Sequence, residues 1–558
     1  MRALMLLPLM ALLPATVGDG AVTPPLSVLL AGVPICGEDA SPVVTKTELM
    51  PGYGDGGFPI VTTKPDAQAF FDNGMQLAHA FAHKAASAAF AEAVRRDPAC
   101  AMCQWGAAWS DGPTINYPID AAAMTKAAGK VAAAEKLLTP ASPARERELI
   151  AALKLRYLKG GGTGAGDAGF AAAMAALAER YPEDDSIATI AADAWMVPAS
   201  LSSLTTNLPR AVALLEGVLK RRPDYTPAIH FYIHATEMNG FPARAEPYAD
   251  RLPRLAPRAS HLVHMPSHTF YWIGRYQDAA DANVAAVAVG IANAKQQGLP
   301  QPGGEWLLPY HGHNVQFGVG GALLSGDAKQ ALALSGPLLA AAPHQAEASN
   351  PFVQMAMGTA YAAQGRFADP QRVLALPDPG AKLGFARAYW HYARGEAQAR
   401  LGNAAGVRAE LARIPDSIGR ANEKDMTAHA TRLMRIARLV LEGRAAMIDG
   451  KPLVAARWFE KAAKLDESPL MRGLSDPPAW WYPPRRSVAA ALLLAGKPKE
   501  ALAQAELALV RRPNDPVTLS LRAEAQTALG QVEAAAGSRA LAEQGWHGDK
   551  AGLAAKLA

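Results

Sequence analysis

Apolar positions follow a helical period along most of the chain. After a lead-in rich in proline and glycine that ends near Lys64, alanine and leucine recur at three-and-four spacing, and stretches of strand-like alternation are few. A period of about 3.6 residues is typical of amphipathic helices, whereas strict alternation is typical of half-buried strands. The pattern therefore predicts an all-α protein.

The helical pattern also repeats at a fixed length. In the first clear unit, Gly74, Ala86, Phe90, Ala93 and Pro98 stand at places 8, 20, 24, 27 and 32 of a 34-residue frame. A tetratricopeptide (TPR) repeat holds small residues at the places where its two helices touch, an aromatic residue between them and a helix-ending proline. The unit therefore predicts a TPR-type helix hairpin.

Later units keep this frame. Pro223 and Pro257 are 34 positions apart, as are Gly240 and Gly274. A glycine at the end of a first helix permits the left-handed turn that a helix hairpin needs. We expect roughly nine or ten units, stacked into an all-α, TPR-type helix-hairpin solenoid with a right-handed superhelix. The glycines predicted to end first helices are Gly240, Gly274, Gly326, Gly365, Gly402, Gly450, Gly496 and Gly530.

The pattern divides the chain into five segments. We expect a signal segment at 1–20, an irregular lead-in at 21–66, an N-terminal array at 67–293, an insertion loop at 294–311 and a C-terminal array at 312–558. A further insertion, SDPPAWWYPPRR, interrupts the C-terminal array. Insertions in solenoids gather on particular faces and often serve binding, so either could fold over the concave groove.

The N-terminus has the composition of an export signal. Arg2 precedes the apolar run ALMLLPLMALLPATV, and small residues follow. Such a run is typical of a secretory signal and too short for a comfortable membrane span. We therefore expect a periplasmic or secreted protein, with no membrane span once the signal is removed.

Composition sets two further limits. The net charge of +5 is spread over 558 residues without a basic stripe, so nucleic-acid binding is not expected. Cys36, Cys100 and Cys103 are too few for a disulfide-built scaffold. The spacing of the last two permits a disulfide, although cysteines in an alanine-rich helix are more often small packing residues.

Histidine pairs recur in register in two successive units. His230 and His264 both take the fifth place of a unit, and His234 and His268 both take the ninth. Side chains four apart on a helix lie on one face. In the TPR architecture, places two, five, nine and twelve of the first helix line the concave surface. Both pairs are therefore expected to face the groove from adjacent helices about 8–10 Å apart.

Other residues at these inward places extend the cluster. Glu237 and Tyr271 take the twelfth place of the two units, and His261 takes the second place of the later one. His311 and His313 follow at the lip of the next unit. His83 lies at the turn of the first unit and would come near only if the superhelix curled back.

Clustered imidazoles predict a transition-metal site. Neutral imidazole binds zinc or copper, and two histidines with a carboxylate suit iron. An imidazole-rich site with few carboxylates favours copper, with iron and zinc as alternatives. The candidate metal ligands are His83, His230, His234, His261, His264, His268 and His313.

The same residues define the expected chemistry. In an enzyme, Glu237 would be a ligand or a general base, and Tyr271 a proton donor or an orienting group. Metal-dependent oxidation is favoured slightly over hydrolysis, and both stay open. The ligand expected in the concave groove is a small molecule or a peptide.

From Phe70 to its end, the chain resembles a group of exported bacterial TPR proteins that are largely uncharacterised. The resemblance implies the fold and export, and it implies no substrate. His83, His230, His234, His264, His268 and His313 lie inside the shared stretches. Those stretches are FFDNGMQLAHAFAHKAASAAFAEAVRRDPACAMCQWG, IHFYIHATE, HLVHMPSHTFYWIGRY, YHGHN and WWYPPRR.

A protein-interaction scaffold is the alternative from another class. Most TPR arrays bind peptides or protein partners rather than catalyse reactions. On this hypothesis Trp105, Trp109, Trp480 and Trp481 would anchor a partner, and the histidines would be incidental.

Overall fold

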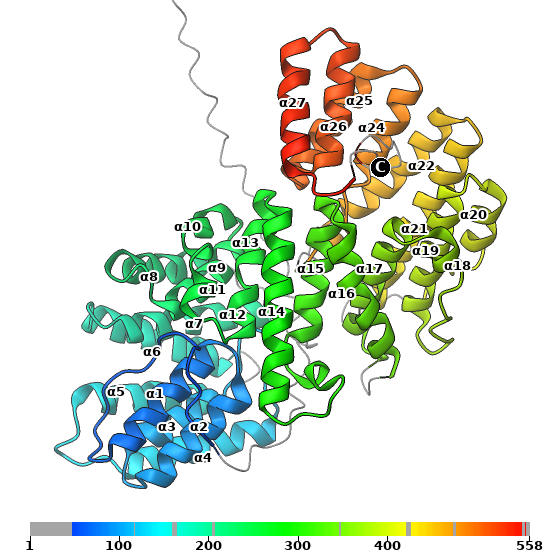
Figure 1. Ribbon diagram of the computed structural model, residues 1–558. Helices are drawn as coiled ribbons and strands as arrows, with labels where there is room; N and C mark the ends of the chain where they lie inside the picture. Colours follow the sequence, from blue (N-terminus) through cyan, green and yellow to red (C-terminus); the bar gives the residue numbers. More distant parts are fainter. Residues whose placement is uncertain are drawn as a thin grey trace, which may run out of the picture.

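The computed structural model consists of helices joined by turns and loops, with no extended strand among the residues that it describes. Consecutive helices pack as antiparallel hairpins, which stack side by side (Figure 1). The predicted all-α, TPR-type solenoid is confirmed. The predicted signal segment and most of the lead-in lie outside the described residues. Those residues are 47–116, 118–158, 165–202, 207–344, 348–419, 426–472, 476–549 and 553.

The N-terminal half comprises fourteen α-helices in the described ranges. They are α1 (Pro65–His79), α2 (His83–Arg96), α3 (Ala101–Ser110), α4 (Ala121–Lys136), α5 (Ala144–Tyr157), α6 (Ala165–Arg180), α7 (Asp185–Ser202), α8 (Leu208–Arg221), α9 (Thr226–Met238), α10 (Glu246–Ala249), α11 (Leu252–Leu255), α12 (Ser260–His264), α13 (Pro266–Ile273) and α14 (Tyr276–Gln296).

The C-terminal half continues the array in the same way. Its helices are α15 (His311–Ser325), α16 (Ala328–Ala341), α17 (Pro351–Phe367), α18 (Pro370–Leu374), α19 (Gly384–Arg400), α20 (Ala404–Leu411), α21 (Thr427–Ile448), α22 (Pro452–Asp466), α23 (Pro469–Arg472), α24 (Arg485–Leu494), α25 (Pro498–Arg511), α26 (Pro516–Ala528) and α27 (Val532–Gly545). Short 3-10 turns lie at Pro242–Ala245, Gly304–Leu307 and Ala342–His344.

The C-terminal repeats return to the middle of the chain. The Tyr276 hydroxyl at the start of α14 donates to the carbonyl of Pro513, 2.8 Å away. The backbone amide of His547 donates to the carbonyl of Ser325 at 2.8 Å. Figure 1 shows the same return, with α26 and α27 above α14 and α15. Residues far apart in sequence can therefore share one site near α13 and α15.

Glycine ends the first helix of most predicted units. Seven of the eight predicted glycines have positive φ, as at Gly240 (82°) and Gly274 (84°). The prediction is wrong for Gly365, which lies inside α17. A Cβ there would be 3.0 Å from the Cα of Ala393, so this glycine serves close packing against α19. At the other seven predicted positions, glycine adopts the left-handed conformation that the turn requires.

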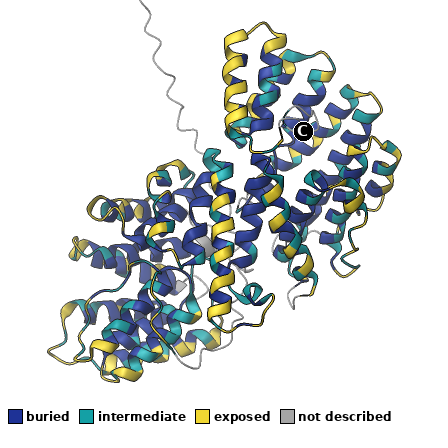
Figure 2. Ribbon diagram, viewed as in Figure 1, coloured by how far each residue is buried: buried dark blue, intermediate teal, exposed yellow. Residues whose placement is uncertain are grey.

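Small residues let the first helices approach closely. Phe90 of α2 is fully buried, and its ring lies against Gly74 of α1 and Gly106 of α3. A Cβ at Gly106 would lie 2.4 Å from the Phe90 ring. Figure 2 shows the same arrangement throughout, with buried residues where helices face one another and exposed residues on the outer helices.

The cysteines and tryptophans named from the sequence are all buried where the structure describes them. Cys100 and Cys103 are joined in a disulfide at the start of α3, and both are also buried. The tryptophans proposed as surface anchors are at most 7% exposed. They cannot present a large apolar surface to a partner in this conformation. These tryptophans are Trp105, Trp109, Trp480 and Trp481.

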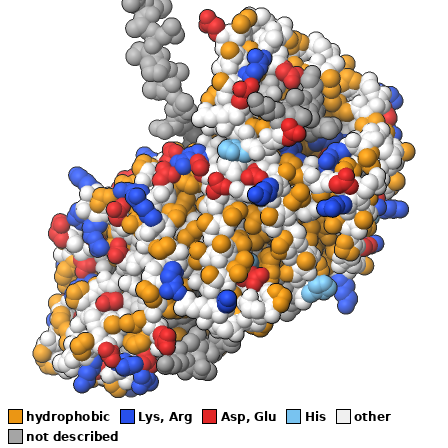
Figure 3. Space-filling view, viewed as in Figure 1, with side chains coloured by type: hydrophobic (Ala, Val, Ile, Leu, Met, Phe, Trp, Pro, Cys, Tyr) orange, Lys and Arg blue, Asp and Glu red, His pale blue; other side chains and the backbone are white. Residues whose placement is uncertain are grey.

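The surface carries mixed charge. Lysine, arginine, aspartate and glutamate side chains are interspersed on the face shown in Figure 3. Within the described ranges, none of the helices combines the length and the apolar character needed to cross a bilayer.

Gly106→Ala tests the close packing of the first repeat. The added methyl group would overlap the buried Phe90 ring, so we expect a loss of about 1–3 kcal/mol in unfolding free energy. Gly129→Ala, in the exposed middle of α4 with open space around it, is the control. It should gain about 0.5–1 kcal/mol. Thermal and denaturant unfolding measure both, and equal stability of the two variants would contradict the packing argument.

Candidate metal centre

Four helices bring six histidines together. His230 and His234 come from α9, His261 and His264 from α12, and His268 from α13. The sixth, at position 313, comes from the first turn of α15. Helix α9 packs against α13, and α12 packs against α15. All six side chains are at most 7% exposed. The histidine cluster is His230, His234, His261, His264, His268 and His313.

The cluster divides into two sets of three. In each set, one ring nitrogen from every member lies within 4.8 Å of the others. Glu237 joins His234 and His268 in a third set of the same compactness, so it links the first two. The first set is His230, His234 and His261, and the second set is His264, His268 and His313.

Outer oxygen atoms fix the orientation of two rings. Nδ1 of His230 lies 2.6 Å from the carbonyl oxygen of His79, and Nδ1 of His264 lies 2.7 Å from Oδ1 of Asn283. The Asn283 amide nitrogen donates to the carbonyl of Ala279, so its oxygen faces the histidine. Because these oxygens only accept, each Nδ1 carries the proton. Each Nε2 is then left with a lone pair that points into the cluster.

Those inward nitrogens meet in close pairs. Nε2 of His230 lies 3.1 Å from Nε2 of His261, and Nε2 of His264 lies 2.9 Å from Nε2 of His268. Two imidazole lone pairs at such a distance repel each other unless a proton or a cation lies between them. A metal ion that displaces this proton would satisfy both nitrogens.

Further ring nitrogens of the cluster have no hydrogen-bond partner within the described part of the chain. They are Nε2 of His234, Nδ1 of His261 and Nδ1 of His313. A buried polar atom without a partner costs about 1–3 kcal/mol, so three in one cluster call for a ligand.

Burial keeps most of the cluster uncharged. Transfer out of water disfavours the imidazolium ion and lowers the pKa of His230 to about 3. The same cause, strengthened by repulsion between neighbouring histidines, lowers the pKa of His234, His261, His264 and His313 well below the ordinary value. Neutral imidazole is the form that binds metals.

His268 is the exception because carboxylates face it. Its Nδ1 lies 2.8 Å from Oε2 of Glu237 and 3.4 Å from Oδ1 of Asp476. Burial alone would lower the pKa of His268, but the two carboxylates outweigh burial and raise it to about 9. The metal-free cluster thus holds a proton that His268 donates to its neighbours.

Asp476 is a site residue that sequence reasoning missed. It belongs to the insertion SDPPAWWYPPRR, one of the two insertions that could fold over the concave groove. Its Oδ1 also lies 3.6 Å from Nε2 of His313. Burial raises the pKa of Asp476 above the usual range. In the sequence, Asp476 is only an acidic residue within an insertion, and no neighbouring residue indicated that it would contact the histidine cluster.

Of the two predicted catalytic residues, Glu237 contacts the histidine cluster directly, whereas Tyr271 contacts Phe317. Both Glu237 oxygens are engaged, since Oε1 accepts from the Trp272 indole at 2.9 Å and Oε2 faces His268. The Tyr271 ring packs against Phe317, which itself contacts three cluster histidines. Burial raises the pKa of Tyr271 to about 12. Glu237 thus belongs to the site, and Tyr271 lies behind Phe317.

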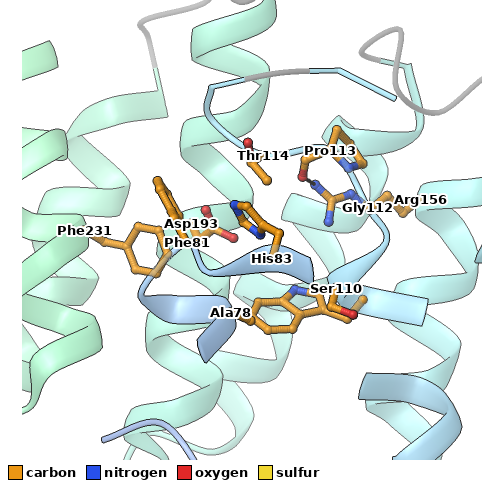
Figure 4. Close-up of a pocket in the computed structure, with 11 residues that line it drawn as sticks. Ala78, Phe81, His83, Ser110, Gly112, Pro113, Thr114, Arg156, Asp193 and Phe231 are labelled. Carbon is orange, nitrogen blue, oxygen red and sulfur yellow. Dashed lines mark hydrogen bonds between the residues drawn. The ribbon is translucent and has the colours of Figure 1, made fainter. Parts of the chain in front are cut away.

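His83 and His311 lie outside the two sets. His83 stacks on Phe81 with 5.2 Å between ring centroids, and Phe81 in turn contacts His230. His83 also lines a small pocket with Asp193 (Figure 4). His311 packs against Trp306 at 4.7 Å. The Phe81 ring therefore lies between His83 and the cluster, and His83 does not belong to either set of ligands.

Comparisons with known proteins assign the chain to no family. No family model matches the chain, and no curated protein matches it. Solved structures of helical-repeat proteins are similar at low identity. Human IFIT1 with a capped RNA is 13% identical over 80% of this chain and 90% of that chain, with a TM-score of 0.31. Yeast Tom70 is 11% identical over 84% and 90%, with a TM-score of 0.31. The P58(IPK) TPR domain is 13% identical over 69% and 96%, with a TM-score of 0.20. Likeness at this level carries no argument about function.

Glu237→Gln in the metal-free protein tests the charge at His268. Removing one carboxylate should lower the pKa of His268 from about 9 toward 6.5, because the imidazolium ion loses its nearest counter-charge. A raised pKa stabilises the fold fully below pH 6.5, and that contribution is lost as pH rises through about 9. Histidine NMR titration measures the shift. Glu179→Gln, at an exposed position of α6, is the control, and an unchanged His268 pKa in the Glu237 variant would refute the assignment.

Proposed function

We propose that this protein binds transition-metal ions in the histidine cluster of a TPR-type solenoid. One observation carries the proposal: six buried imidazoles, five of them held neutral, turn converging and partly unsatisfied ring nitrogens toward one another. Oxygen acceptors behind the rings give the arrangement that metal-binding histidines usually have. A satisfied structural core would leave fewer buried nitrogens without partners.

The two sets support two adjacent metal positions. The first set offers only imidazole nitrogens, and Glu237 links it to the second. Copper is favoured because imidazole is a good ligand for it and carboxylates are few, and iron and zinc are the alternatives. The redox chemistry that copper or iron supplies is therefore favoured slightly over hydrolysis.

Export is part of the same proposal. The composition of residues 1–20 supports a signal segment, and a metal site in the periplasm or outside the cell follows from it. Under this proposal Glu237 holds the proton of His268 or acts as a ligand, and Tyr271 orients the site through Phe317.

The variant His234→Ala/His268→Ala tests metal binding. These residues connect the two sets, so we expect loss of bound metal with unchanged helical content. Elemental analysis of protein purified without chelator or affinity nickel measures it, with circular dichroism as the check on folding. His344→Ala/His547→Ala, outside the cluster, is the control and should keep wild-type metal. A folded double variant with its metal content intact would remove the proposal.

A second pair of variants tests the number of ions. His230→Ala/His261→Ala breaks the first set alone, and His264→Ala/His313→Ala breaks the second. Each should retain about half of the wild-type metal, because a tri-imidazole site needs its three ligands. Complete loss in both would indicate a single shared ion instead.

A further inference from the structure

A large cavity lies beside the histidine cluster. Its volume is about 880 Å³, which is within the range of pockets that hold drug-sized organic ligands, about 300–1,000 Å³. Its walls come from the α1–α2 turn, α2, α4, the end of α14 and the loop before α15. The first described residues of the chain, from Thr47 to Tyr53, also contribute.

His261 connects the cavity with the metal centre. It lines the cavity and belongs to the first set of ligands. Two aromatic rings lie against it, Phe81 with 4.9 Å and Tyr310 with 4.3 Å between ring centroids. Both rings also line the cavity. Phe81, Tyr310 and His261 therefore form the wall between the hollow and the metal ligands.

Phe81 and Tyr310 both have a left-handed backbone conformation. Phe81 has φ 56° and Tyr310 has φ 67°, a region that bulky L residues rarely adopt. Phe81 takes place fifteen of its unit, where Gly240 and Gly274 make the left-handed turn in later units. A ring in the place of a glycine is strained, and such strain is typical of functional sites. The strained conformation holds the Phe81 ring against His230 and His261.

The remaining walls join apolar surface to positive charge. Lys130 and Lys126 lie 2.6 and 3.7 Å from Asp111, and the walls carry three lysines against the two acids Asp111 and Glu48. A ligand with an apolar body and a negative group complements such walls. The apolar lining includes Met50, Tyr53, Leu77, Leu299 and Leu308, and the lysines are Lys84, Lys126 and Lys130.

We propose that this cavity binds an organic acid with an aromatic body and presents it to the metal centre at His261, past Phe81 and Tyr310. The cavity and its charge argue for the ligand, whereas presentation to a metal rests on the proposed function. The aromatic body would lie on the Phe81 and Tyr310 rings, and the acid group would face the lysines of α2 and α4.

Two fluorescent probes of similar shape test the ligand class on the full-length, metal-free protein. The anion 8-anilinonaphthalene-1-sulfonate should bind at one molecule per chain, and uncharged N-phenyl-1-naphthylamine should bind more weakly. Ala88→Trp places a large side chain in the cavity from α2, so we expect at least about tenfold weaker binding of both probes. Ala536→Trp on the exposed outer face of α27 is the control and should change neither.

The variant Lys84→Gln/Lys126→Gln separates charge from shape. Both lysines are exposed at the cavity wall, so the fold should tolerate the change. It should weaken anion binding about tenfold and leave the uncharged probe unchanged. Equal binding of the anion to wild type and Ala88→Trp would overturn the cavity, and equal loss of both probes in the lysine variant would overturn the organic acid.

Metal content measured on the same samples keeps the two proposals apart. Cavity-dependent probe binding in a protein that takes up no copper, iron or zinc refutes the metal centre and leaves the ligand pocket. Metal binding without saturable probe binding refutes the ligand pocket and leaves the metal centre. Copper(II) should quench the bound anion in wild type and not in His230→Ala/His261→Ala, and equal quenching in both would refute presentation at His261.

Discussion

Desolvation of imidazole is the constraint on which this site depends. Burial makes the imidazolium form costly, so the cluster histidines stay neutral where a surface group would titrate near pH 6.5. Neutral rings at close range have lone pairs that need a proton or a cation. Besides the N–H that each neutral ring carries, Glu237 and Asp476 hold one additional proton at His268, and three ring nitrogens of the cluster have no hydrogen-bond partner among the described residues. Under the proposed function, the same burial that leaves these nitrogens without partners prepares the cluster for a metal ion.

A repeat architecture can build such a cluster from a few residues at the same places of successive repeats. His230 and His264 are one repeat apart, so stacking two hairpins places them on neighbouring helices that face one groove. The α12–α13 break comes at Pro266, which has no amide hydrogen to donate, yet His264 and His268 keep their four-residue contact. The scaffold thus needs no dedicated loop to gather the first five imidazoles.

The place of each residue within the 34-residue repeat explains which parts of the fold and site could be predicted from the sequence and which could not. The fold, the turn glycines and both histidine pairs follow from the spacing of small, apolar and histidine residues, because each depends on contacts within one repeat or between neighbours. Asp476 depends on the path of the whole superhelix, which brings a C-terminal insertion to α13 and α15. Gly365 has the right spacing and packs against another helix instead. Place twelve puts Glu237 in the site, whereas Phe317 of the next unit covers Tyr271.

The carboxylates make the two halves of the cluster electrostatically unequal. Around His230 and His261 the described contacts are imidazole, backbone carbonyl and aromatic rings, and the one carboxylate close to the first set is Glu237, beside His234. Asp476 lies against two members of the second set, and Glu237 is bonded to one of them. Under the proposed function, charge balance in a low-dielectric interior favours an ion of lower charge in the first set than in the second. A divalent ion is better placed in the second set, where two negative groups can offset its charge and His268 gives up its proton on binding.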